Sequence, residues 1–393
     1  MGIFSKNKNK NELMLVFNIG SSSVEGALFL AQSSGVPKII FSTSEQIQLE
    51  DKIDIDRFYN LAMQSLEIVA GRIYKAGLGA PKEIFCVLSS PWHVSQTRII
   101  NYKKNTPFVF TAKLAESLIK KETELFEEEH LKNKVSGAVS NRIIELKNIK
   151  TTLNGYETAE PINQKVQELE IIIFISMSEE ETLKKIEDTI SKSFHFNKIR
   201  FCSFTLSSFT VVRGMYPKQE NFLLLDVGGE VTNVAMVKKN ILHESISFPS
   251  GRNFLTRGVA SSLGCTLNEA NSLISLLKDG HAEKSVVEKL ETVMNQLKAK
   301  WLKQFQESLV NISNDISIPS TIYMTADKDL ADFFCQTIKS EQFNQYTLTE
   351  SKFEIIFLDL PMFLGISVFK DVSVDKTSLV IDSIYINRFL TKI

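Results

Sequence analysis

The same short pattern occurs at two distant places in the chain: an apolar run, a turn containing glycine, and a second apolar run. The first copy spans residues 16–30 and the second spans residues 224–237. Each copy predicts two strands joined by a tight turn, because glycine adopts the backbone conformations that such turns require. Two similar hairpins in one chain indicate a protein built from two similar halves.

Both copies are followed by the same order of elements. After the first, the sequence predicts a strand at 38–41, a helix at 56–76 and a buried strand at 83–89. After the second, it predicts a strand at 241–248 and a helix beyond Gly251. Each half is therefore of the α/β class, and a chain of 393 residues exceeds what one hydrophobic core usually supports.

A block of different order separates the halves. Residues 91–176 read as strand, helix, strand, strand, with a turn at Asn154 and Gly155, which indicates a small inserted subdomain. Glutamates between residues 122 and 129 favour a solvated helix face, with docking of a basic partner as the alternative. We expect this block to project from the first half as the main partner surface and to be removable without unfolding the rest.

These patterns divide the chain into five parts. They are a flexible N-terminal tail at 1–12, a first half at 13–90 and 177–218, the inserted subdomain at 91–176, a second half at 219–369 and a C-terminal segment at 370–393. In the last part, residues 379–390 are rich in β-branched side chains, which suit a strand at least as well as a helix.

Composition excludes several functional classes. The chain has 45 basic and 46 acidic residues and no basic stripe with interleaved aromatic residues, so a nucleic-acid partner is not expected. The 4 cysteines lie far apart without a C-x-x-C pair, which predicts neither a zinc site nor a disulfide framework and favours the cytoplasm. No apolar run approaches the ~18 residues of a membrane span, so we expect membrane contact to be peripheral at most.

The two turns are candidate phosphate-binding loops. A glycine turn at a strand end can aim successive backbone N–H groups into one concavity, which suits phosphate oxygens. One such turn would be weak evidence, but two at matching positions are much stronger. The candidate residues are Asn18, Gly20, Ser21, Ser22 and Ser23 in the first copy and Asp226, Gly228, Gly229 and Thr232 in the second. We expect the turns to face each other across a cleft, with the N–H groups of Gly20 and Gly228 pointing into it.

The segment after the second hairpin carries a family likeness. Residues 247–260 (SFPSGRNFLTRGVA), followed by residues 267–271 (LNEAN), resemble the corresponding segment of the FtsA/PilM family of actin-like ATPases. The inserted block sits where that family carries its SHS2-type subdomain, and the likeness extends to about Phe369. It implies an α/β, actin-like two-domain fold with duplicated halves and an inserted SHS2-type subdomain.

The resemblance also implies a ligand, ATP with Mg²⁺, in the cleft. It adds Glu230 and Asn233 to the residues beside the phosphates and makes Asp226 the metal ligand. Asn271 and Ile274 stand where family members commonly have Glu and Lys. The residues that it places on the adenine and ribose side are Gly251, Asn271, Ile274, Thr325, Ala326 and Asp327.

Several residues depart from the family pattern. Asn18 and Asn233 stand at typical aspartate positions, and Glu230 stands at a typical glycine position, where its charge would face the terminal phosphate. Ala326 and Asp327 replace the usual pair of glycines against which the base slides. These departures predict weakened ATP binding and at most slow hydrolysis, and they predict that Asn18→Asp or Glu230→Gly would tighten Mg-ATP binding.

The resemblance implies a bacterial, ATP-binding scaffold in the cytoplasm at the periphery of the inner membrane. It is FtsA-like in cell division, or alternatively PilM-like in type IV pilus assembly. A nucleotide-free scaffold and a small-molecule kinase are further alternatives, and Glu230 is the only carboxylate that suggests a kinase base. The implied partners are division or pilus proteins at the inner membrane, and self-association stays open. FtsA-like chains usually end in an amphipathic membrane-targeting helix, so the β-branched end at 379–390 favours the pilus alternative.

Overall fold

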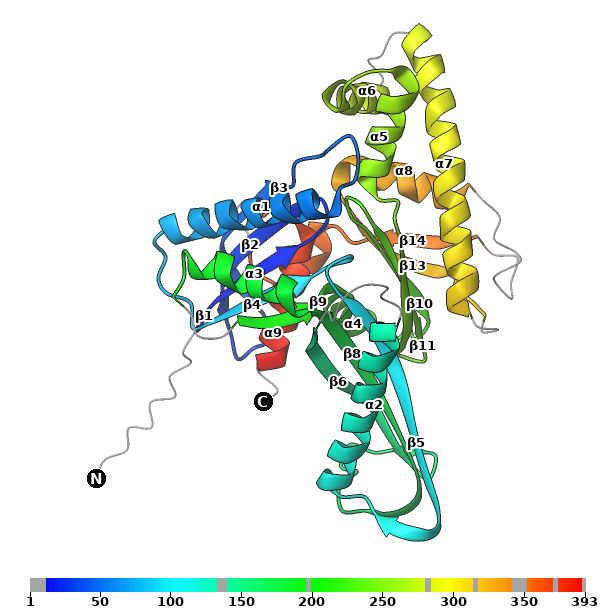
Figure 1. The fold of residues 1–393 in the computed structure, drawn as a ribbon. Helices are drawn as coiled ribbons and strands as arrows, with labels where there is room; N and C mark the ends of the chain where they lie inside the picture. The colour runs from blue at the N-terminus through cyan, green and yellow to red at the C-terminus, as the bar shows by residue number, and fades with distance from the viewer. Residues whose placement is uncertain are drawn as a thin grey trace.

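Two five-stranded sheets and one four-stranded sheet form the frame of the protein (Figure 1). The computed structural model describes residues 12–132, 140–195, 199–279, 284–313, 317–340, 352–369 and 374–390. The first sheet has the strand order β3-β2-β1-β4-β9 and the second the order β12-β11-β10-β13-β14. The third sheet, β5-β8-β6-β7, belongs to the inserted block, hereafter the insert.

In the described parts of the chain, the first half consists of the first sheet and four helices. Its strands are β1 (Glu12–Ile19), β2 (Ser23–Ala31), β3 (Lys38–Gln46), β4 (Glu83–Leu88) and β9 (Ile199–Ser203), and its helices are α1 (Ile55–Lys75), α3 (Glu180–Ser191), α4 (Phe204–Met215) and α9 (Thr377–Leu390).

The second half consists of the second sheet and its helices. Its strands are β10 (Phe222–Val227), β11 (Thr232–Lys238), β12 (Ile241–Phe248), β13 (Thr321–Ala326) and β14 (Glu354–Phe357), and its helices are α5 (Arg252–Leu263), α6 (Leu267–Asp279), α7 (Lys284–Ser313), α8 (Lys328–Lys339) and the short η1 (Leu360–Phe363). The insert contains β5 (Val94–Val109), α2 (Ala112–Lys132), β6 (Asn141–Leu153), β7 (Tyr156–Glu157) and β8 (Lys165–Glu179).

The two large sheets have the same topology. In each, an antiparallel hairpin (β1–β2 or β10–β11) extends to a third antiparallel strand on one side, while two later strands add in parallel on the other. This confirms the duplication that the two glycine turns predict. Both hairpins are buried on two faces, which explains why their strands read as almost continuous apolar runs.

Helices α4 and α9 lie between the two large sheets, while α1 and α3 cover the outer face of the first sheet. Along β1, Leu15 and Phe17 face α1 and α3, while Met14 and Val16 face the core shared with α4, α9 and the second sheet. The far side of the second sheet packs on α5, α7 and α8. The two halves therefore share one continuous core around α4 and α9.

The C-terminal segment is a helix, so the expectation of a strand at 379–390 is wrong. In α9, side chains on every side of the helix are buried, among them Leu379, Ile381, Ile384 and Ile386. Burial of each such side chain contributes about 1.5–3 kcal/mol, which outweighs a strand preference that spans only about 1 kcal/mol. Within the described ranges, no helix combines the length and apolar character of a membrane span.

The insert extends away from both halves, but its base is built into the core (Figure 1). Glu145 of β6 is buried and accepts hydrogen bonds from the Ser203 amide (3.0 Å), the Ser203 hydroxyl (2.8 Å) and the Tyr385 hydroxyl. Burial raises the pKa of Glu145, although these hydrogen bonds oppose the rise. Phe174 of β8 belongs to the shared core. These contacts argue against removing the insert without unfolding the rest.

Candidate functional site

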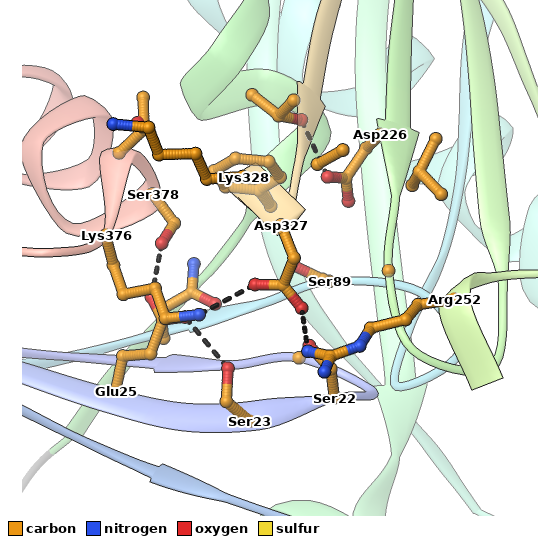
Figure 2. Close-up of a pocket in the computed structure, with 18 of the residues that line it drawn as sticks. Ser22, Ser23, Glu25, Ser89, Asp226, Arg252, Asp327, Lys328, Lys376 and Ser378 are labelled. Atoms are coloured by element: carbon orange, nitrogen blue, oxygen red, sulfur yellow. Dashed lines mark hydrogen bonds and ion pairs between the residues drawn. The ribbon is translucent and has the colours of Figure 1, made fainter. Parts of the chain in front are cut away.

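A cavity of about 480 Å³, hereafter the cleft, lies between the two halves at the ends of the hairpins (Figure 2). It is lined by both turns, by the end of β13 and by the residues that precede α9. The predicted site residues that line it are Asn18, Gly20, Ser21, Ser22, Ser23, Asp226, Gly228, Thr325, Ala326 and Asp327. That these residues bind nucleotide stays a prediction.

The glycine amides of the two turns do not point into the cleft. The Gly20 N–H donates to the Ser23 carbonyl at 3.1 Å, and the Gly228 N–H donates to the Val231 carbonyl at 3.0 Å. Each amide therefore closes its own hairpin turn, and the expectation of two free phosphate-binding amides at these positions is wrong.

The two turns touch each other directly. The Ser21 hydroxyl accepts a hydrogen bond from the Glu230 N–H at 3.1 Å. A Cβ added to Gly229 would lie 2.4 Å from the Ser21 carbonyl oxygen, and one added to Gly251 would lie 2.3 Å from the Gly228 carbonyl oxygen. Positions 229 and 251 need glycine because the backbone of another segment lies where a Cβ would be. Gly251 therefore packs against the second turn.

Glu230 points away from the cleft into an ion pair. Its carboxylate accepts two hydrogen bonds from the Arg257 guanidinium (2.6 and 2.8 Å) and one from the Asn253 amide (2.7 Å). Arg257 also donates to the Glu50 carbonyl of the first half at 2.7 Å. The expectation that Glu230 faces a terminal phosphate is therefore wrong, and the kinase alternative loses its suggested base.

Four other predicted residues lie outside the lining of the cleft. Thr232 donates to the Ser250 carbonyl (2.6 Å), and Asn233 donates to the Thr205 hydroxyl (3.2 Å). Asn271 accepts a hydrogen bond from Thr256 at 2.9 Å, and Ile274 packs against the outer core of the second half. Among the described residues, these four make structural contacts within the protein.

Asn18 has a partner that the sequence does not reveal. Its amide Nδ2 donates to Asp382 Oδ2 of α9 at 2.7 Å, and both side chains are buried. Burial raises the pKa of Asp382 well above its ordinary value, although the bond from Asn18 opposes this. A carboxyl group is therefore present beside position 18, but it comes from the far end of the chain.

Asp327 pairs with one cation from each half. Its carboxylate accepts hydrogen bonds from Arg252 Nη1 (2.9 Å) and Lys376 Nζ (2.7 Å), as Figure 2 shows. Burial opposes ionisation of Asp327, but Lys376 and Arg252 together outweigh it and lower its pKa. Neither cation was singled out from the sequence.

In this arrangement, several groups that could bind a triphosphate already have partners within the protein. The turns are in contact, the Glu230 amide is used by Ser21, and Asp327 already takes the hydrogen bonds of two cations. Across the described residues, no group of three or more His, Cys, Asp or Glu side chains is placed to hold a metal ion. Carboxylates also outnumber cations: Glu25, Asp226, Asp327, Asp329, Asp359 and Asp375 line the cleft against Arg252, Lys328 and Lys376. ATP with Mg²⁺, and Asp226 as its metal ligand, stay predictions.

Asp226 makes the stability of the protein depend on pH. Burial raises its pKa from 3.8 to about 6, although a hydrogen bond from Thr325 (2.7 Å) opposes the rise. The native state therefore binds more protons than the unfolded chain between these values, and stability falls as pH rises through that window. Because Asp226 keeps some exposure to the cleft, we expect Asp226→Asn to stabilise the protein by about 2 kcal/mol at pH 8. Urea unfolding at several pH values should show this gain disappearing near pH 4.

A second cavity, of about 520 Å³, lies where the insert meets α4 and α9. This basic cavity is lined by Lys147, Asn148, Ile149, Leu206, Phe209, Thr210, Arg213, Gly214, Tyr385 and Arg388, with no carboxylate among them. Burial lowers the pKa of both Arg213 and Arg388, and Arg213 lies over the Phe209 ring with 4.7 Å to its centroid.

Such a surface suits an anion with an apolar part, because cations and apolar side chains line the same cavity and hydrogen bonds to ionised groups are among the stronger ones. Sequence reasoning missed this cavity, since its residues come from three remote segments and no motif joins them.

Comparisons with known proteins bear on the fold. No protein-family model and no curated protein matches the sequence. The chain is similar to a chain of the PilM-PilN type IV pilus biogenesis complex, with a TM-score of 0.61 and 11% identity over 95% of this chain and 97% of that one. Ethanolamine utilization protein EutJ from Carboxydothermus hydrogenoformans gives a TM-score of 0.46 and 9% identity, covering 95% of this chain and 91% of that one. At 11% identity, the first of these similarities speaks for the fold alone. With its duplicated sheets, the protein has an actin-like ATPase fold.

Proposed function

We propose that this protein is a cytoplasmic scaffold that holds an extended segment of an inner-membrane partner in the basic cavity, as a PilM-like component of type IV pilus assembly. The observation that carries the proposal is the basic cavity itself, with Lys147, Arg213 and Arg388 around an apolar wall. The similarity to a chain of a pilus biogenesis complex supports the pilus assignment over a division role.

The cavity indicates the chemistry of the partner. Arg213 and Arg388 suit aspartate or glutamate side chains through charge-assisted hydrogen bonds. Leu206 and Phe209 suit an adjacent aliphatic or aromatic side chain. The bound segment therefore combines acidic and apolar residues.

The backbone of β6 indicates how such a segment would lie. One edge of β6 pairs with β8, while β7 pairs only with Thr152 and Leu153 on the other edge. Residues 147–149 of β6 line the cavity, so a partner segment can add as a strand beside them. This mode needs no change in the cleft, and the proposal requires no nucleotide.

Fluorescence anisotropy with labelled synthetic peptides tests the proposal. The peptides are the cytoplasmic ends of inner-membrane proteins encoded beside this gene, with those of division proteins as a second set. We expect a pilus peptide to bind wild type and Arg213→Glu to weaken binding at least about tenfold, because an attractive charge becomes repulsive. Thr210→Trp, which fills the cavity without changing charge, should weaken binding similarly.

Lys218→Glu is the matched control, because Lys218 is exposed just beyond α4 and does not line the cavity. It should bind as wild type does, and melting curves should show that all three variants are folded. Binding of division peptides alone would overturn the pilus assignment. Binding that neither cavity variant weakens would overturn the proposed site.

A further inference from the structure

The position of Asp327 is unusual for a residue that begins a helix. It precedes α8 as the N-cap residue, yet its side chain makes no capping hydrogen bond. Its carboxylate instead lies between Arg252 and Lys376 (Figure 2). An aspartate at this position usually caps the helix by accepting a hydrogen bond from a backbone N–H group. The Asp327 carboxylate instead accepts hydrogen bonds from two cationic side chains.

The two cations come from different halves of the protein. Arg252 is the first residue of α5 in the second half, and Lys376 directly precedes α9, which packs in the shared core against β1 and β2. The side chains of Asp327, Lys376 and Arg252 keep only 17%, 16% and 25% of their exposure, so water screens the pairs incompletely. The Asp327–Lys376 pair therefore fastens the second half to the first.

The same two cations are what a phosphate group would require. A guanidinium and an ammonium that converge on one point can bind a carboxylate or a phosphate oxygen alike. They converge inside the cleft that both hairpin turns line, so an external phosphate would have to displace the Asp327 carboxylate.

We propose that Asp327 fills an anion subsite made by Arg252 and Lys376, replacing from within the chain the phosphate group of a bound ligand. The two halves are thereby linked at the cleft without nucleotide. The proposal goes beyond the scaffold function, because it concerns the cleft and not the basic cavity. It predicts that the subsite becomes available to small phosphate anions once the Asp327 carboxylate is removed.

Calorimetric titration with inorganic pyrophosphate tests this proposal. Asp327→Ala should bind pyrophosphate at least about tenfold more tightly than wild type, because Arg252 and Lys376 lose the carboxylate that bridges them, although Glu25 still interacts with Lys376. Adding Lys376→Met to Asp327→Ala should abolish the gain. Asp332→Ala is the matched control, since Asp332 is exposed on α8 and does not line the cleft, and it should bind as wild type does.

The proposal is overturned if Asp327→Ala binds pyrophosphate no better than wild type, or if the gain survives Lys376→Met. If Asp327→Ala does not fold, Asp327→Asn keeps the size of the side chain and carries the same expectation. The proposed scaffold function is tested separately. Asp327→Ala should still bind the pilus peptide as wild type does, whatever its affinity for pyrophosphate.

Discussion

Asn18→Asp is expected to destabilise the protein by about 3 kcal/mol or more at pH 8. The change converts the buried 2.7 Å bond from Asn18 Nδ2 to Asp382 Oδ2 into a contact between two carboxyl groups. Two carboxylates this close cannot both ionise without a large cost, and a buried charge without a partner typically costs about 3–5 kcal/mol. This reverses the expectation from the family resemblance, in which the same change improves Mg-ATP binding.

The pH dependence of the variant should identify the cause. Repulsion raises the pKa of the carboxyl pair in the folded state, so the loss of stability grows as pH rises and shrinks toward pH 5. Asn18→Asp combined with Asp382→Asn restores one amide and one carboxylate in exchanged positions. Urea unfolding of wild type, both single variants and the pair should show the double variant recovering most of the loss. Equal stability of Asn18→Asp and wild type at pH 8 would contradict this account of the contact.

Gly251→Ala is expected to cost about 3 kcal/mol in stability. An added Cβ would lie 2.3 Å from the Gly228 carbonyl oxygen and 2.5 Å from that of Gly229. Both obstacles are backbone atoms of the second turn, so no side-chain rotation relieves the clash and the turn itself must move. Thermal and urea unfolding measure the effect.

Gly71→Ala provides the matched control. Gly71 lies within α1, and an added Cβ there meets no atom within 4 Å. Because alanine favours a helix over glycine, we expect a gain of about 0.5–1 kcal/mol from the same chemical change. If Gly251→Ala is as stable as wild type, the second turn is not packed against the start of α5 as described.

The sequence predicts best those parts of the fold that are determined by residues close together in the chain. The two hairpins each combine an apolar run with a glycine turn, and the resulting duplication appears as two sheets of one topology. Helix α1 follows from apolar spacing alone and begins within one residue of the predicted start. These features depend on neighbours in the chain, which a sequence displays directly.

The parts that depend on distant residues could not be predicted in this way. The strand preference of the residues at 379–390 does not predict the helix that they form. This helix is stabilised by burial of its side chains between the two sheets. The family resemblance implies that Glu230 faces a phosphate, but its carboxylate forms an ion pair with Arg257. Asp382, the hydrogen-bond partner of Asn18 at the head of the first hairpin, lies 364 residues away. No spacing rule connects such pairs.

The most direct test of the account is the pilus-peptide titration repeated with and without Mg-ATP. If the basic cavity binds the peptide while Asp327 occupies the anion subsite of the cleft, wild type should bind the peptide in the absence of nucleotide. Saturating Mg-ATP should change its affinity by less than about twofold, which is well under 1 kcal/mol. Peptide binding that appears only when Mg-ATP is present would contradict the account, because it would make the cleft a working nucleotide switch.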